Sequence, residues 1–184
     1  MGQNKALLRL GRQTLIEHVL AVLSPLVSQT GIISSTAEEY AHLSVECYRD
    51  RWPGLGPLGG IGTALENSHN DYSLILACDM PLVSRELLEL LIDKSPNYQV
   101  TVPKEADGHL QPLCALYHRS CLKTIERLIE QGRYSPRDLF SEVNTLIVPF
   151  EAIAGLAHSE RLFENVNTPE DLARISDLLK IPPK

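Results

Sequence analysis

The chain has 184 residues, a length typical of one domain with a buried core. Its 43% hydrophobic and 22% charged residues are typical of a globular protein, and no apolar run approaches the roughly 20 residues that cross a bilayer. The formal net charge of -6 argues against a nucleic-acid partner, whose phosphates require a broad basic surface, whereas small anionic ligands need only a few local cations.

Strands and helices alternate in the first half of the chain. Thr14 and Glu17 have the spacing of a capping box, which predicts a helix from there to Pro25. Thr36 and Glu39 have the same spacing before a brief helix. Residues 72–78 form a continuous apolar run that ends at Asp79, and such a run is typical of a strand covered on both faces in a parallel sheet. The other elements expected here are strands over 31–34 and 44–48 and a helix over 57–65.

The second half continues the pattern. Ser84 is a favourable cap for a helix, and Gly132 ends an amphipathic helix over residues 120–131. Thr168 and Pro169 begin the last helix. Extended segments are expected over 99–102, 113–117 and 145–148, with a short helix from 135. Because no repeat or linker divides residues 1–184, the alternation predicts a single α/β domain with right-handed crossovers.

The cysteines and histidines show no metal-ligand spacing. There is no C-x-x-C pair and no H-E-x-x-H motif, so we expect neither a zinc site nor a disulfide framework. The first residues, 1–5, do not resemble a signal peptide. Together these features favour a reducing cytoplasm, with no membrane partner.

Asp79 follows the clearest strand of the chain. In open α/β sheets, ligands bind beyond the carboxyl ends of the strands, and a carboxylate there can hold Mg²⁺ together with substrate phosphates. The alternative is a helix cap or a solvated loop acid. The segment Trp52–Gly62 is rich in glycine and proline. Its glycines can let the backbone approach a ligand before a helix N-terminus, or can serve only close helix packing.

Five segments, in order along the chain, resemble the molybdenum cofactor guanylyltransferases. Met1–Leu8 resembles the second half of their opening signature, L-x-G-G-x-S-x-R-M-G-x-D-K, and Gly56–Ile61 is similar to G-P-L-x-G-I. Ala77–Pro81 resembles C-D-M-P, and Gln111–Leu113 resembles Q-P-L. Asn165–Leu172 matches N-x-N-T-P-E-D-L. Five collinear motifs are a specific signal, although each alone is modest.

The resemblance implies a Rossmann-like, three-layer nucleotidyltransferase fold with a mostly parallel central sheet. It also implies a reaction in which GTP and molybdopterin, or its molybdenum-bearing form, give the guanine dinucleotide cofactor and pyrophosphate with Mg²⁺. The implied partners are the two small-molecule substrates, molybdopterin-synthesis proteins, and apo-molybdoenzymes or their chaperones.

Matching positions carry roles from the family to this sequence. Lys5 is expected to contact nucleotide phosphates, and Asp79 is expected to bind the metal. The remaining implied positions are Ser34 and Asp50 in the nucleotide site, Gln111 near the pterin, and Asn165 and Asn167 near the mouth of the site.

Each of these residues has an alternative interpretation. Lys5 can be a solvated surface residue, and Asp50 can form a surface ion pair with a neighbouring arginine. Cys78 can be proposed as a nucleophile, but a small buried residue at a strand end is the ordinary interpretation. Asn165 and Asn167 can instead stabilise a turn.

Two departures from the family pattern bear on function. Asn4 stands where the family has an aspartate before the lysine. The chain also begins at the methionine inside the opening signature, so the first strand, central in this fold, and its phosphate-binding loop are expected to be missing. We therefore expect the natural protein to be longer.

Three functions compete at this point. The first is the guanylyltransferase, and the second is a cytidylyl- or sugar-phosphate nucleotidyltransferase of the same superfamily. The third is a non-catalytic family member in which the phosphate loop is absent.

Overall fold

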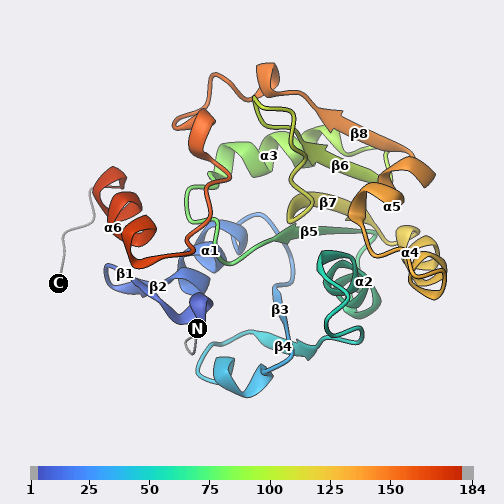
Figure 1. Cartoon of the computed structure of the whole chain (residues 1–184), viewed down its shortest axis with the longest axis horizontal. Helices are drawn as coiled ribbons and strands as arrows, with labels where there is room; N and C mark the ends of the chain where they lie inside the picture. The colour runs from blue at the N-terminus through green and yellow to red at the C-terminus, as the bar shows by residue number, and fades with distance from the viewer. Residues whose placement is uncertain (1–3, 180–184) are drawn as a thin grey trace.

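The computed structural model describes residues 4–179, in which helices cover both faces of a β-sheet (Figure 1). The largest sheet has the strand order β5-β7-β6-β8. β7 is antiparallel to both β5 and β6, and β6 is parallel to β8. The strands of this sheet are β5 (Tyr72–Leu76), β6 (Val100–Pro103), β7 (Cys114–His118) and β8 (Thr145–Val148).

Two smaller sheets complete the β-structure of the described residues. β3 (Gly31–Ser34) and β4 (Glu46–Arg49) form a parallel pair. β1 (Arg9–Leu10) and β2 (Gln13–Thr14) form a short antiparallel hairpin, which the sequence did not predict. Within residues 4–179, β3 pairs only with β4, and β5 pairs only with β7.

The α/β fold expected from the sequence is confirmed, with one reversed strand. β5, β6 and β8 run in the same direction, and β7 runs against them. The link between β6 and β7 folds back through a turn with Gly108 at φ +92° and a bridge between Lys104 and Leu110. Because this link contains no crossover helix, it can join only antiparallel neighbours.

The helices begin where the sequence placed caps, with one exception. Glu17 N donates to Thr14 Oγ1 at 3.3 Å, and Thr168 with Asp171 makes a second capping box. Thr36 makes no such bond: its hydroxyl lies 3.3 Å from Ser34 Oγ, and the following turn is a 3₁₀ helix. The α-helices are α1 (Leu15–Leu23), α2 (Pro57–Asn67), α3 (Arg85–Lys94), α4 (Cys121–Glu130), α5 (Pro136–Glu142) and α6 (Pro169–Leu178). The 3₁₀ helices are η1 (Lys5–Leu7), η2 (Ala37–Tyr40), η3 (Phe150–Ala152) and η4 (Ser159–Arg161).

The core has two layers of side chains on opposite faces of β7. Ala115 and Tyr117 pack with Ile125 and other residues of α2 and α4. The alternate residues, Cys114 and Leu116, pack with α3. This alternation follows from the two-residue period of a strand and produces the three layers that the resemblance implied. Within residues 4–179, no helix combines the length and the apolar character that a membrane span requires.

Candidate active site at the carboxyl edge of the sheet

Several predicted site residues lie at one edge of the β-structure. Ser34 ends β3, Asp50 follows β4 directly, and Asp79 lies just beyond β5. Gln111 precedes β7, and because β7 is antiparallel, its amino end meets the carboxyl ends of β5 and β6. This is the edge where open α/β sheets bind their ligands.

Lys5 is held at this edge by a hydrogen bond from the other end of the chain. Its Nζ donates to Asn167 Oδ1 at 2.8 Å. Asn4 fixes the turn that carries Lys5, because Asn4 Oδ1 accepts from Ala6 N at 3.1 Å and its Nδ2 donates to Glu39 (2.6 Å) and the Tyr40 hydroxyl (2.9 Å). An ammonium group has three donors, so Lys5 retains capacity for an anionic ligand.

Asp79 is half-buried beside Lys5. Burial raises the pKa of the Asp79 carboxyl, while a hydrogen bond from its own backbone and the Lys5 ammonium act in the opposite direction. No side chain of the described residues donates to this carboxylate. The backbone of Asp79 is also tied to the C-terminal motif, since Val166 N donates to Asp79 O at 2.9 Å. Two motifs far apart in sequence therefore form one structure around a carboxylate and an ammonium.

Asp50 is positioned by Thr63 in the middle of α2 and by the loop before that helix. Its Oδ1 accepts from Trp52 N at 3.0 Å and from Thr63 Oγ1 at 3.1 Å. The surface ion pair considered for Asp50 is not formed, because Arg51 pairs instead with Glu66 (2.7 Å) and Glu126 (3.0 Å). Asp50 is thus a fixed acceptor in the loop rather than part of a surface charge pair.

The glycine-rich segment serves close packing and also places a helix N-terminus. A Cβ at Gly62 would lie 2.7 Å from Trp52 Cζ3, and one at Gly59 would lie 2.8 Å from Trp52 O, so both positions require glycine for contact with Trp52. Gly56 precedes α2 with φ +70°. Pro57, the first residue of α2, lines the same cavity as Asp50 and Asp79.

The remaining predicted residues differ in how they are held. Ser34 Oγ accepts from Thr36 N at 3.1 Å, and Gln111 Nε2 donates to Glu105. Asn165 is exposed, and its side chain has no hydrogen bond within residues 4–179. Asn167 lies at the candidate site and also stabilises a turn. Its side chain accepts from Lys5, and its backbone N–H donates to Asp171 Oδ2 at 3.0 Å. Of the seven residues, only Lys5 and Asn167 are joined directly by their side chains.

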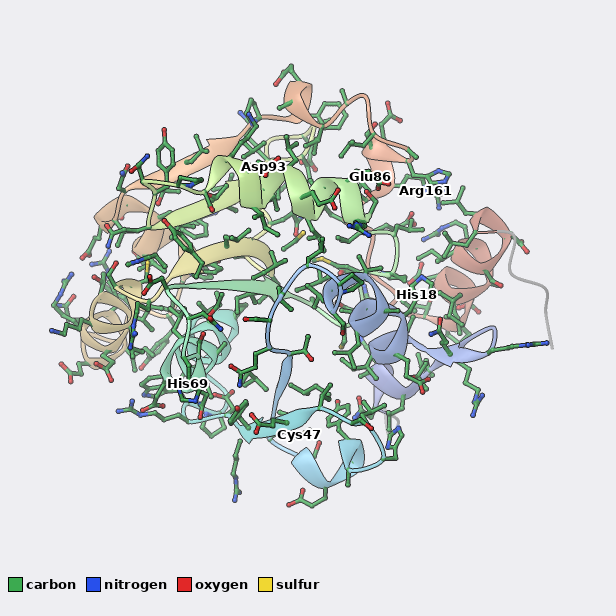
Figure 2. The ribbon with its side chains drawn as sticks, turned by 180° about the vertical axis from the view of Figure 1, so that it is seen from behind. His18, Cys47, His69, Glu86, Asp93 and Arg161 are labelled. Atoms are coloured by element: carbon green, nitrogen blue, oxygen red, sulfur yellow. The ribbon has the colours of Figure 1, made fainter. Side chains whose placement is uncertain are left out.

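Among residues 4–179, the cysteine and histidine side chains do not gather into a metal-binding group, and Cys78 is not activated as a nucleophile. Burial, followed by the charge of Asp79, raises the pKa of Cys78 to about 11, so its thiol is protonated at neutral pH and is a poor nucleophile. In the part of the chain that the structure describes, no three His, Cys, Asp or Glu side chains group as metal ligands. His18 on α1, Cys47 on β4 and His69 after α2 come from separate elements (Figure 2).

Sequence reasoning missed the supporting roles of three residues, of which only Asn4 had been singled out, as a departure from the family pattern. Thr63 holds Asp50, Asn4 caps the turn at Lys5, and Glu105 accepts from Gln111. Thr63 carried a weak signal, because a hydroxyl in an otherwise apolar helix face needs a partner. Glu105 carried none, since its contact with Gln111 depends on the turn between β6 and β7.

Comparison with known proteins identifies the family of this chain. Residues 1–146 match the model of the MobA-like NTP transferase domain. A probable molybdenum cofactor guanylyltransferase from Carboxydothermus hydrogenoformans is 39% identical over 181 residues, which cover 98% of this chain and 89% of that protein. A second protein of that name, from Pelotomaculum thermopropionicum, is 36% identical over 95% of this chain and 84% of its own length.

Solved structures show the same fold. Molybdopterin-guanine dinucleotide biosynthesis protein A from Archaeoglobus fulgidus superposes with a TM-score of 0.80 at 30% identity, over 97% of this chain and 92% of that one. The 2-C-methyl-D-erythritol 4-phosphate cytidylyltransferase from Thermus thermophilus has a TM-score of 0.72 at 17% identity, over 96% and 94%, and supports the fold alone. The chain is therefore a nucleotidyltransferase that belongs to the MobA-like NTP transferase family.

Proposed function

We propose that this enzyme transfers GMP from GTP to molybdopterin or its molybdenum-bearing form. The names of the similar proteins support this substrate pair. The observation that carries the proposal is the joining of Lys5, Asn167 and Asp79 at the carboxyl edge of the sheet. An ammonium beside a carboxylate is the arrangement that a metal-bound triphosphate requires.

The reaction balances without a strong general base. A phosphate oxygen of the pterin substrate, already ionised at neutral pH, attacks the α-phosphorus of GTP. One P–O bond forms, the bond from the α-phosphorus to the bridging oxygen breaks, and pyrophosphate leaves. The protein therefore has to align the two substrates and neutralise charge as it develops.

The described residues suit that task. Lys5 brings a positive charge to the phosphates, and Asn167 fixes the position of its Nζ. Asp50 presents a carboxylate whose Oδ1 accepts from Thr63 and the Trp52 amide, and its Oδ2, which has no donor among residues 4–179, can accept N–H groups of the guanine base. The N-terminal amides of α2 add a partial positive charge near the same place.

The donor set around Asp79 fits Mg²⁺. Mg²⁺ prefers oxygen ligands and usually takes only one or two carboxylates, with substrate phosphates and water completing its shell. A half-buried carboxylate with no competing side-chain donor matches this demand better than a cluster of nitrogen or sulfur ligands. When bound, Mg²⁺ neutralises phosphate charge. Asp79 would hold the ion, and the Lys5 ammonium would neutralise further negative charge on the same triphosphate.

An assay with competing nucleotides tests the proposal. The protein is incubated with molybdopterin, Mg²⁺ and an equimolar mixture of GTP and CTP, and the products are identified by mass. We expect the guanine dinucleotide and pyrophosphate in equal amounts. A cytosine dinucleotide as the main product would instead assign the enzyme to the cytidylyltransferases, and no dinucleotide from either nucleotide would contradict the proposed transfer to molybdopterin.

A further inference from the structure

Asn4 lies immediately before Lys5, and its one amide holds three groups. Asn4 Oδ1 accepts from Ala6 N at 3.1 Å and caps the turn η1. Asn4 Nδ2 donates to Glu39 Oε2 at 2.6 Å and to the Tyr40 hydroxyl at 2.9 Å. The amide therefore joins the turn that carries Lys5 to η2, although Asn4 and Glu39 are 35 positions apart in the sequence.

The orientation of this amide follows from the chemistry of its neighbours. A carboxylate only accepts hydrogen bonds, so the atom of Asn4 that faces Glu39 has to be the nitrogen. A backbone N–H only donates, so the atom that faces Ala6 has to be the oxygen. Both requirements give the same orientation, and both N–H donors of the side chain then have an acceptor.

η2 provides a firm anchor beside the nucleotide side of the candidate site. Tyr40, the last residue of η2, is buried and belongs to the same apolar cluster as Ile32 of β3. The connection that contains η2 starts directly after Ser34, a candidate nucleotide-binding residue at the end of β3. The contacts of Asn4 with η2 therefore link the Lys5 turn to that side of the site.

Lys5 is thus held from two directions. Its Nζ donates to Asn167 Oδ1 at 2.8 Å, and its backbone lies in the turn that Asn4 ties to η2. The first contact fixes the ammonium to the loop before α6, and the second fixes the backbone from which the side chain extends. If the turn moved relative to η2, the ammonium would leave the position at which Asn167 accepts from it.

An aspartate at position 4 would be incompatible with Glu39. It could still accept from Ala6 N, because aspartate and asparagine are about equally good caps. Its second oxygen, however, would face the Glu39 carboxylate, and two acceptors of like charge at hydrogen-bond distance repel one another. Asn4, which departs from the aspartate of the motif that this segment resembles, is therefore matched to the glutamate at position 39.

We propose that Glu39 is a positioning residue for Lys5 and that it acts through the Asn4 amide. Glu39 acts on the turn rather than on the substrate, and it holds the turn where the Lys5 ammonium meets the nucleotide phosphates. This role rests on the proposed function, because it requires Lys5 to act on those phosphates. It also connects the phosphate side of the nucleotide site to the segment that follows Ser34.

A reciprocal exchange of the two side chains tests the proposal. Asn4→Asp removes the donor and adds a charge, and Glu39→Gln in the same protein supplies a new donor to that aspartate. The matched control is Glu38→Gln, which removes the same charge from the neighbouring exposed residue of η2. Thermal midpoints of all the variants report whether each protein is folded.

Two quantities are measured for each protein. The first is kcat/KM for guanylyl transfer. The second is the rate at which sulfo-N-hydroxysuccinimide acetate labels the Lys5 amine relative to the exposed Lys123, determined by mass spectrometry. Because labelling does not depend on transfer, it reports the position of Lys5 even if the protein transfers no GMP.

We expect Asn4→Asp to lower kcat/KM about five- to tenfold and to speed the labelling of Lys5 at least about threefold, a modest change because the bond to Glu39 lies at the surface. Glu39→Gln alone should change either quantity less than about twofold, since its amide oxygen still accepts from Asn4. The two changes together should restore both quantities to within about twofold of the wild type, whereas Asn4→Asp with Glu38→Gln should stay impaired. In a Lys5→Met background, Asn4→Asp should cost no further transfer.

Three labelling results would overturn the proposal: a wild-type rate for Lys5 in Asn4→Asp, no restoration by Glu39→Gln, or equal restoration by Glu38→Gln, which would indicate a general effect of surface charge. A loss of transfer from Asn4→Asp that persists in Lys5→Met would also contradict it, since Asn4 would then act separately from Lys5. A wild-type protein that transfers no GMP, with labelling in the predicted order, would reject the proposed function and leave the positioning of Lys5 by Glu39 supported.

Discussion

Lys5 and Asn167 lie 162 positions apart in the sequence, yet Lys5 Nζ donates to Asn167 Oδ1 at 2.8 Å. This bond connects the first described turn to the loop before α6. A backbone hydrogen bond from Val166 N to Asp79 O connects the same loop to the segment after β5. The three segments around the candidate phosphate site are thus mutually fixed before any substrate binds. Such preorganisation reduces the reorganisation that catalysis would otherwise require.

The Lys5–Asn167 bond predicts a strongly non-additive mutant pair. Lys5→Met should lower transfer at least about a hundredfold, because it removes charge at the phosphates. Asn167→Ala should lower it about five- to tenfold, equivalent to about 1–1.4 kcal/mol for one hydrogen bond. Once Lys5 is Met, adding Asn167→Ala should cost nothing further. Steady-state kcat/KM for the four proteins of the cycle measures this.

The control for Lys5→Met is Lys123→Met, which removes one charge from the exposed face of α4. It should leave transfer unchanged. If the losses from Lys5→Met and Asn167→Ala simply add, Asn167 acts on the substrate independently and does not position Lys5.

Thr63 should determine the position of Asp50. Thr63→Val removes the hydroxyl whose single proton is shared between Asp50 Oδ1 (3.1 Å) and Gly59 O (3.0 Å), and which accepts from Arg51 N. We expect the Kd for GTP to rise about tenfold and the free energy of unfolding to fall by about 1 kcal/mol, because the Arg51 N–H, in a part-buried bond, loses its acceptor. Titration calorimetry and urea unfolding measure the two effects. Thr63→Ser keeps the hydroxyl and should restore most of both, whereas wild-type GTP affinity in Thr63→Val would remove Asp50 from the nucleotide site.

Two neighbouring glycines of α2 should respond in opposite ways to alanine. At Gly62 a Cβ would lie 2.7 Å from Trp52 Cζ3 and 3.1 Å from Ile125 Cγ2, so Gly62→Ala should destabilise the protein by about 1–3 kcal/mol. At Gly60 nothing lies within 4 Å, so Gly60→Ala should stabilise the helix by up to about 1 kcal/mol. Urea midpoints at equal m-values provide the measurement. Similar effects from the two changes would mean that Trp52 does not pack on α2.

His18 should make stability depend on pH in the mildly acidic range. Burial lowers the pKa of His18, so between its usual value of about 6.5 and the lower folded value the unfolded chain binds a proton that the folded protein does not. Stability is therefore full above about pH 6.5 and falls as the pH drops below it. His18→Gln should flatten this decline below about pH 6.5 in urea unfolding. The exposed His69 provides the control: His69→Gln should follow the wild type, and an equally steep decline in His18→Gln would contradict the assignment.

Local signals in the sequence were sufficient for most elements of the fold. The capping box at Thr14, the Thr168–Pro169 helix start and the apolar run before Asp79 depend on neighbouring residues, and the two helices formed as predicted. The strand also formed, but it ends at Leu76, is partly buried and pairs antiparallel with β7 rather than lying covered on both faces in a parallel sheet. The β1–β2 hairpin was missed because each strand has only two residues, too few to show alternation. The reversal of β7 was missed because it depends on the turn at Gly108, which fixes pairing between residues distant in the chain.

The candidate site was predictable as a set of residues but not as a geometry. The motifs named Lys5, Asp79 and Asn167, but the bond between Lys5 and Asn167 exists only after α6 packs beside α1. The alternative ion pair at Asp50 was reasonable in sequence, where Arg49 and Arg51 are its neighbours. In the fold, Arg51 turns to two glutamates on α2 and α4, which no local pattern could show.

The central claim is that Asp79 holds the metal of a bound nucleoside triphosphate beside Lys5. Titration of GTP with and without Mg²⁺, on the wild type and on Asp79→Asn, measures this directly when paired with the rate of guanylyl transfer. We predict that Mg²⁺ strengthens GTP binding only in the wild type, and that Asp79→Asn lowers turnover at least about a hundredfold, or about 2.7 kcal/mol of barrier. Equal strengthening by Mg²⁺ in both proteins, with turnover retained in Asp79→Asn, would contradict it.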